Sequence, residues 1–143
     1  MDFAIIKIIV AALLGGIIGL EREEMKKPAG LRTHMLVCMG ACLFALSSTN
    51  FATDPARIAS GIVTGIGFIG AGCIIARRDK IEGISTAASL WVTGAIGLSV
   101  GISTSIEEFI LPSITALLVV FILHIGAIVK KRLRSSKNAR KNL

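Results

Sequence analysis

Five long apolar runs, separated by short charged connections, limit what this chain can fold into. The runs are Phe3 to Leu20, Thr33 to Phe51, Pro55 to Ala76, Ile84 to Ile102 and Phe109 to Val129. A helix needs about 20 apolar residues, with roughly 17 to 25 tolerated, to cross about 30 Å of hydrocarbon. Lipid offers the backbone no hydrogen bonds, so such runs satisfy their own amides and carbonyls as helices. The sequence therefore predicts an all-α integral membrane protein with five transmembrane helices.

Composition supports a membrane protein. Hydrophobic residues make up 53% of the 143 residues and the mean hydropathy is +0.77, which is too apolar for a soluble domain of this length. The first run has no basic residues before it and no small-x-small cleavage site after it, so we expect a retained helix rather than a signal peptide. We predict a transmembrane domain over residues 1–130 and a basic cytoplasmic tail over residues 131–143.

The basic residues lie mostly on one side of the predicted membrane. Four lie in the first connection, three in the third and seven between residues 130 and 143, which accounts for fourteen of the sixteen lysines and arginines. Because cytoplasmic loops carry the excess of Lys and Arg, the N-terminus is expected outside and the C-terminus in the cytoplasm. Lys7 is expected to extend outward from the first helix. The acid-free tail is expected to lie on membrane lipids, and a nucleic-acid partner is not expected.

Local signals predict where three of the helices begin. Asp54, followed by a proline, fits the N-cap of the third helix. Ser85 or Thr86 is a candidate cap for the fourth. Ser105, with Glu108 three residues later, fits a capping box for the fifth.

Small residues recur at helical spacing and predict close helix packing. The expected packing positions are Gly15, Gly19, Gly61, Gly65, Gly67, Gly70, Gly72, Trp91, Gly94 and Gly97. Glycines fall on both faces of the third run, so that helix is expected to lie between neighbours. The run also contains G-x-G-x-x-G, but a dinucleotide fingerprint needs a preceding strand, which an apolar helix does not supply. Packing within the chain is favoured over a homo-oligomer interface.

The distribution of metal-ligating side chains argues against an ion site inside the membrane. His34, Cys38 and Cys42 form a stripe on the second helix, but its ends lie about 12 Å apart, so one ion cannot use all three. All nine carboxylates lie at or beyond the ends of the runs, whereas cation carriers usually place acids within the bilayer. We therefore predict no metal site and no cofactor.

Polar residues gather where the first helix ends and the second begins. The cluster comprises Glu21, Arg22, Glu23, Arg32, Thr33 and His34. If the two helices are antiparallel neighbours, Arg32 returns to the level of Glu21 or Glu23 and could pair with either carboxylate. Both a helix-end salt bridge that only fixes the turn and a functional site fit this pattern.

Three motifs in order resemble signatures of the MgtC/SapB family of bacterial membrane proteins. The motifs are GLERE with AGLRTH (19–23 and 29–34), DPARIA with GIGFIGAG (54–59 and 65–72), and STAASLW with AIG (85–91 and 95–97). The resemblance runs from about Ala11 to Val129. It implies a five-helix, multi-pass protein of the bacterial or archaeal cytoplasmic (inner) membrane that is linked to low magnesium. It also implies a regulator of other membrane proteins, with ATP synthase or transporters as partners.

Two departures limit what the resemblance implies. Many members have a soluble C-terminal domain that is not seen in this sequence, so functions of that domain, including a role in virulence, are not expected here. Some members have Asn at the position of Ser85, so a contact made by that amide is not expected.

The favoured hypothesis is a non-enzymatic membrane protein that modulates partner proteins and is linked to magnesium homeostasis. The expected binding residues are Glu21, Arg22, Glu23, Arg32, Thr33, His34, Asp54, Arg57, Ser85 and Thr86. The alternative is an oligomeric transporter or channel for Mg²⁺ or another ion, with Thr64, Ser89 and Thr93 along a pore. No pair of nucleophile and base stands out, so an enzyme is not predicted.

Overall fold

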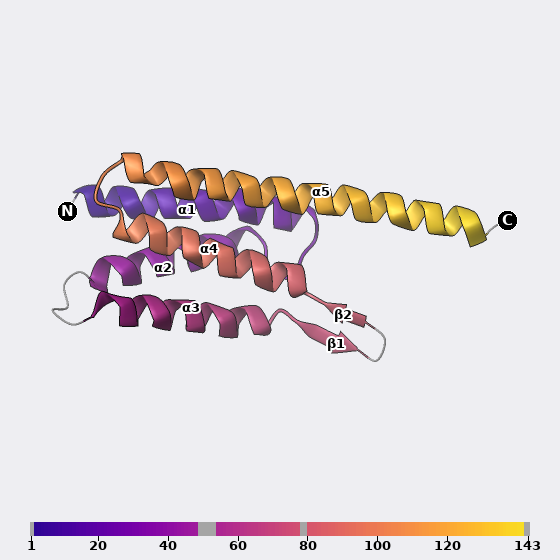
Figure 1. Ribbon diagram of the computed structural model, residues 1–143, viewed down its shortest axis with the longest axis horizontal. Helices are drawn as coiled ribbons and strands as arrows, with labels where there is room; N and C mark the ends of the chain where they lie inside the picture. Colours follow the sequence, from indigo (N-terminus) through magenta and orange to yellow (C-terminus); the bar gives the residue numbers. More distant parts are fainter. Residues whose placement is uncertain (1, 49–53, 78–79, 142–143) are drawn as a thin grey trace.

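The computed structural model describes residues 2–48, 54–77 and 80–141, and most of them are helical (Figure 1). The helices are α1 (Asp2–Glu24), α2 (Leu31–Ser48), α3 (Pro55–Ala71), α4 (Ile84–Ile102) and α5 (Ile110–Lys141). A 3₁₀ turn, η1 (Glu107–Phe109), precedes α5. Between α3 and α4 lies an antiparallel hairpin of β1 (Ile75–Arg77) and β2 (Lys80–Glu82), in which Ala76 pairs with Ile81.

The helices form a bundle with α1, α2 and α4 at its centre. These three helices contact one another, whereas α3 packs against α4 and α2 on one side, and α5 packs against α1 and α4 on the other (Figure 1). We call the end that carries the α1–α2 connection and the β1–β2 hairpin the hairpin end. The opposite end carries the start of α1 and the α4–α5 connection (Figure 1).

Four helices are long and apolar enough to cross a membrane within the described residues, so the chain is a mainly helical membrane protein. They are Asp2–Glu24, Leu31–Ser48, Ile84–Ile102 and Glu107–Val129. The predicted end of the second run at Phe51 lies outside the described residues. α5 continues without a break to Lys141, through residues 131–141 of the predicted basic tail.

The third helix is shorter than predicted. α3 has 17 residues and ends at Ala71, whereas the sequence prediction continued it to Ala76. Glycines on both sides of Ala71 lower helix propensity, and the β-branched Ile74 and Ile75 that follow favour the extended strand that forms there. Its apolar length is therefore at the lower limit for a membrane span.

Two of the three predicted caps needed correction. The Asp54 cap is confirmed, since its Oδ1 accepts the amide of Ala56 at 3.1 Å. The capping box of the last helix is not formed as predicted: Ile106, rather than Ser105, takes the N-cap position of η1, and Glu108 accepts the amide and the hydroxyl of Thr104, at 2.6 and 2.9 Å. Neither predicted residue caps α4, because Gly83 occupies its N-cap position.

Glycines bring the three central helices into backbone contact. A Cβ at Gly15 of α1 would lie 2.6 Å from the carbonyl oxygen of His34 on α2. One at Gly97 of α4 would overlap the carbonyl of Cys38, and one at Gly101 would lie 2.7 Å from that of Cys42. Both cysteines are fully buried in the core, where they act as small packing residues. Small residues permit this close approach where lipid provides no hydrophobic driving force.

A buried lysine links α1 to the end of α4. The ammonium of Lys7 donates to the carbonyl of Gly101 at 3.0 Å and lies 5.0 Å from the ring centre of Phe3. Phe3 in turn stacks on Phe109. The expectation that Lys7 extends outward is wrong, because the side chain is buried. The free carbonyls at the C-terminus of α4 attract its positive charge.

The third helix does not lie between neighbours as the sequence suggested. A Cβ at Gly61, Gly65 or Gly67 would meet nothing within 4 Å. Contact with α4 is made on one face, through the buried Ile66 against Gly94 and through Gly70 against Ala87. At these three predicted packing positions, the described residues leave room beside the helix, and Trp91 on α4 is also half exposed.

Candidate functional site

Two charged residues are buried in the last turn of α1. Glu21 and Arg22 are 7% and 2% exposed, and Arg22 Nη1 lies 3.6 Å from Glu21 Oε2. At this distance the two side chains form an ion pair but not a hydrogen bond. Within the described chain, both carboxylate oxygens of Glu21 and the Nε of Arg22 have no hydrogen-bond partner. Burial of such groups costs free energy, so the pair is an unusual feature of the molecule.

Arg22 joins α1 to the start of α4. Its Nη2 donates to the hydroxyls of Ser85 and Thr86 at 3.2 and 3.3 Å. Ser85 is exposed, whereas Thr86 is buried at 1% exposure. Arg22 therefore connects two of the predicted binding residues of α4 to the last turn of α1.

A buried histidine continues the polar network into the bundle. His34 Nδ1 lies 2.9 Å from the carbonyl of Gly30, so this nitrogen must donate, and Nε2 lies 3.1 Å from the hydroxyl of Ser89. That hydroxyl also lies 2.8 Å from the carbonyl of Thr86. In a neutral imidazole whose proton is on Nδ1, Nε2 can only accept a hydrogen bond. Nε2 and the Thr86 carbonyl then compete for the single hydroxyl proton of Ser89. The geometry thus links the protonation of His34 to the rotamer of Ser89.

The carboxylate of Glu23 caps the second helix. Its Oε2 accepts the amide of Leu31 at 2.8 Å, and a Cβ at Gly30 would lie 2.6 Å from that oxygen. The predicted pairing of Arg32 with Glu21 or Glu23 is wrong. Arg22 pairs with Glu21, and the carboxylate of Glu23 already accepts the backbone amide at the start of α2. The Arg32 side chain is exposed.

The six clustered residues thus occupy two environments. Glu21, Arg22 and His34 are buried between α1, α2 and α4, whereas Glu23 and Arg32 are exposed. Thr33 is half-buried, and Asp54 and Arg57 are exposed at the start of α3, away from this end.

The network also includes residues that the sequence analysis did not place in the cluster. Ser89 bonds His34, and Thr93 donates to the carbonyl of Ser89 at 2.8 Å. The sequence did contain a signal for these residues, because the helical spacing of Thr86, Ser89 and Thr93 places three hydroxyls on one face of α4.

Two polar hollows flank the α1–α2 connection at the hairpin end. One, of about 430 Å³, is lined by Glu23, Lys26, Lys27, Pro28, Gly30, Arg32 and Thr33. The other, of about 610 Å³, we call the lysine hollow; it is lined by residues 26–28 and 80–86. Among the described residues, no three His, Cys, Asp or Glu side chains are grouped so that they could hold a metal ion.

Comparison with known proteins identifies the family. The model of the MgtC family matches residues 8–132. The chain belongs to the MgtC family. The resemblance inferred from the three motifs is therefore confirmed.

Two curated relatives from this family match over much of the chain. "Putative magnesium transporter YhiD" of Escherichia coli (strain K12) is 46% identical over 130 residues, which cover 84% of this chain and 60% of YhiD. "Protein MgtC" of Salmonella typhimurium (strain LT2) is 46% identical over 99 residues, which cover 68% of this chain and 43% of that protein. The chain thus spans part of the length of these relatives. No solved structure matches it.

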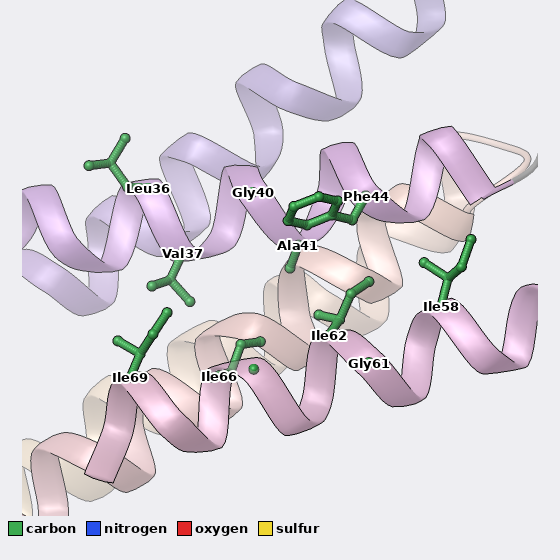
Figure 2. Close-up of a pocket in the computed structure, with 11 residues that line it drawn as sticks. Leu36, Val37, Gly40, Ala41, Phe44, Ile58, Gly61, Ile62, Ile66 and Ile69 are labelled. Carbon is green, nitrogen blue, oxygen red and sulfur yellow. The ribbon is translucent and has the colours of Figure 1, made fainter. Parts of the chain in front are cut away.

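This MgtC family chain also has an apolar groove between α2 and α3. The groove, of about 540 Å³, is lined by Leu36, Val37, Gly40, Ala41, Phe44, Ile58, Gly61, Ile62, Gly65, Ile66 and Ile69. Figure 2 shows Val37 of α2 directed toward α3 near Ile69, with Gly61 on the helix surface below Phe44. With no polar side chain in its lining, the groove suits hydrocarbon rather than an ion or a polar substrate.

Proposed function

We propose that this chain is a non-enzymatic protein of the bacterial or archaeal cytoplasmic membrane that modulates other membrane proteins in adaptation to low magnesium. In this proposal all five helices cross the bilayer, the N-terminus lies outside, and the hairpin end and the C-terminus lie in the cytoplasm. The distribution of Lys and Arg supports this orientation. Membership of the MgtC family supports the link to magnesium.

The arrangement of the hairpin end is the observation that carries the proposal. Arg22 and His34 hold α1, α2 and α4 together from within, through hydrogen bonds to Ser85, Thr86 and Ser89. Glu23 and Arg32 are exposed at the same end of the bundle as these buried contacts. A charged surface held by a fixed set of buried contacts is suited to recognise a partner, because little side-chain and backbone freedom is lost on binding.

The positions of the acids also favour modulation over carriage of a cation. Every carboxylate of the sequence lies at or beyond the ends of the apolar runs, and Mg²⁺ prefers oxygen ligands along its path. The alternative, an oligomeric Mg²⁺ transporter, is supported by the name of the relative YhiD. However, Ser89 and Thr93, which that hypothesis placed along a pore, are buried with their hydroxyls against backbone carbonyls.

Recovery of partners from native membranes tests the docking surface. The tagged chain is compared with Arg32→Ala and with the matched control Arg57→Ala, which removes an equally exposed arginine at the opposite end. We expect Arg32→Ala to lose a membrane protein that wild type and Arg57→Ala both retain. Equal recovery by all three chains would show that the hairpin end is not the docking surface. Glu21→Ala is less informative, because Glu21 is buried and its loss alters the bundle itself.

A flux measurement separates the two functions. Vesicles that contain only this chain are loaded with a Mg²⁺-sensitive dye and exposed to external Mg²⁺. We expect entry no faster than into empty vesicles. Entry that depends on the chain and is abolished by Asp54→Asn or Glu23→Gln would establish the transporter alternative.

A further inference from the structure

The lysine hollow at the hairpin end has the composition of an anion site. Lys26, Lys27 and Lys80 line it, and its lining includes one carboxylate, Glu82, whose oxygen contacts the ammonium of Lys80. The described lining is therefore positively charged. The lysine hollow is distinct from the docking surface, because neither Arg32 nor Thr33 lines it, although residues 26–28 line both hollows.

The first turn of α4 forms a wall of the hollow and has no side-chain cap. Gly83 takes the N-cap position at φ +90°, and a Cβ there would overlap the carbonyl oxygen of Cys73. Only glycine fits this conformation and this contact, and glycine has no side-chain oxygen to accept the first amides. The uncapped amides at the start of a long helix attract an anion.

A second and independent feature is the pair of hydroxyls that face the hollow. Ser85 and Thr86 both line it, and both accept from Arg22 Nη2. Thr86 is 99% buried, with 1% exposure, and because each hydroxyl accepts from Arg22 it keeps its own proton for donation. Arg22 itself is 2% exposed and its Nε has no partner. Arg22, which is ion-paired with Glu21, thus stands behind two hydroxyls that can donate to a ligand.

We propose that the lysine hollow binds a phosphate group, carried either by a phospholipid headgroup or by a soluble phosphate compound. A phosphate offers several acceptor oxygens and negative charge, which match the ammonium, hydroxyl and helix-amide donors of the hollow. A volume of about 610 Å³ accommodates such a group together with part of the molecule that bears it.

The first arm of the test uses inorganic phosphate. The full chain is purified in a maltoside detergent, which contains no phosphate, and its thermal unfolding is followed through its one tryptophan, Trp91 on α4. Phosphate is added at constant ionic strength. The second arm adds phosphatidic acid to the micelles and compares it with diacylglycerol, which has the same chains without the phosphate.

Binding raises the unfolding temperature, and the variants locate it. Lys27→Gln and Ser85→Ala remove donors from partly or fully exposed positions, so folding is preserved, and each is expected to weaken binding by about tenfold. Arg57→Gln is the matched control for loss of one positive charge and is expected to bind as wild type does. Stabilisation by inorganic phosphate identifies a soluble source, and stabilisation by phosphatidic acid alone identifies the headgroup.

Two results would overturn the proposal. One is an unfolding temperature that neither inorganic phosphate nor phosphatidic acid raises above its control. The other is equal weakening by Lys27→Gln and Arg57→Gln, which would show a general response to charge. Because Arg32 is left intact throughout, loss of phosphate binding is distinguishable from loss of a docked partner.

Discussion

The central helices and α3 use glycine in opposite ways. Gly15, Gly97 and Gly101 stand where a neighbouring backbone leaves no room for a Cβ, whereas Gly61 and Gly65 stand where a Cβ would meet nothing within 4 Å. Both sets follow the same helical spacing. Spacing therefore identifies a smooth helix face, but it does not show whether the chain itself covers that face. The open face of α3 adjoins the apolar groove with α2.

The largest expected effect comes from removing the buried cation of the central region. Arg22→Leu leaves the carboxylate of Glu21 buried without its ion pair, which typically costs about 3–5 kcal/mol. Unfolding of the purified chain in detergent measures this loss, and the exposed Arg57→Leu on α3 is the control. The double variant Glu21→Gln with Arg22→Leu is expected to recover much of the stability. A double variant no more stable than Arg22→Leu would show that the charge of Glu21 is not the cause.

A smaller loss is expected at the opposite end of the same region. Lys7→Met removes the ammonium that donates to Gly101 and caps the end of α4, while it keeps a similar apolar length. A hydrogen bond from a charged donor contributes about 1.5–3 kcal/mol. Thermal unfolding measures the change, and amide exchange at residues 98–102 should rise more than exchange at the start of α4. Uniform exchange along α4 would argue against a local cap.

Steric exclusion in the central region predicts the next effect. Gly97→Ala forces a methyl group against the carbonyl of Cys38, and because that neighbour is backbone, α2 and α4 must separate. Overpacking of this kind costs about 1–3 kcal/mol. Unfolding midpoints of Gly97→Ala and wild type give the difference directly. A variant as stable as wild type would mean that α2 and α4 are less closely packed than the structure shows.

Much of the fold, but less of the site, follows from the sequence alone. Apolar runs and the Asp54 cap predicted the helices because length and local capping depend on neighbouring residues. The end of α3 was missed because the apolar run continues past it, and hydropathy does not register the weak helix propensity of Gly70 and Gly72. Arg22 was expected on a docking surface, but it is buried. Which side chain turns inward depends on the packing of three helices, which spacing along one helix does not determine.

The smallest predicted effect tests the open face of α3 itself. Gly65→Ala adds a methyl group where nothing lies within 4 Å and replaces a residue with low helix propensity by the one with the highest. We expect unchanged or slightly raised stability, by up to about 1 kcal/mol. Unfolding in detergent, where the chain is isolated, measures this intrinsic effect. If another helix covers this face in the native membrane, the same methyl group would interfere with the close approach that small residues permit. Cross-linking in native membranes from a cysteine placed at the exposed Phe68, with and without Gly65→Ala, therefore shows whether the open glycines are exposed to lipid or contact another protein.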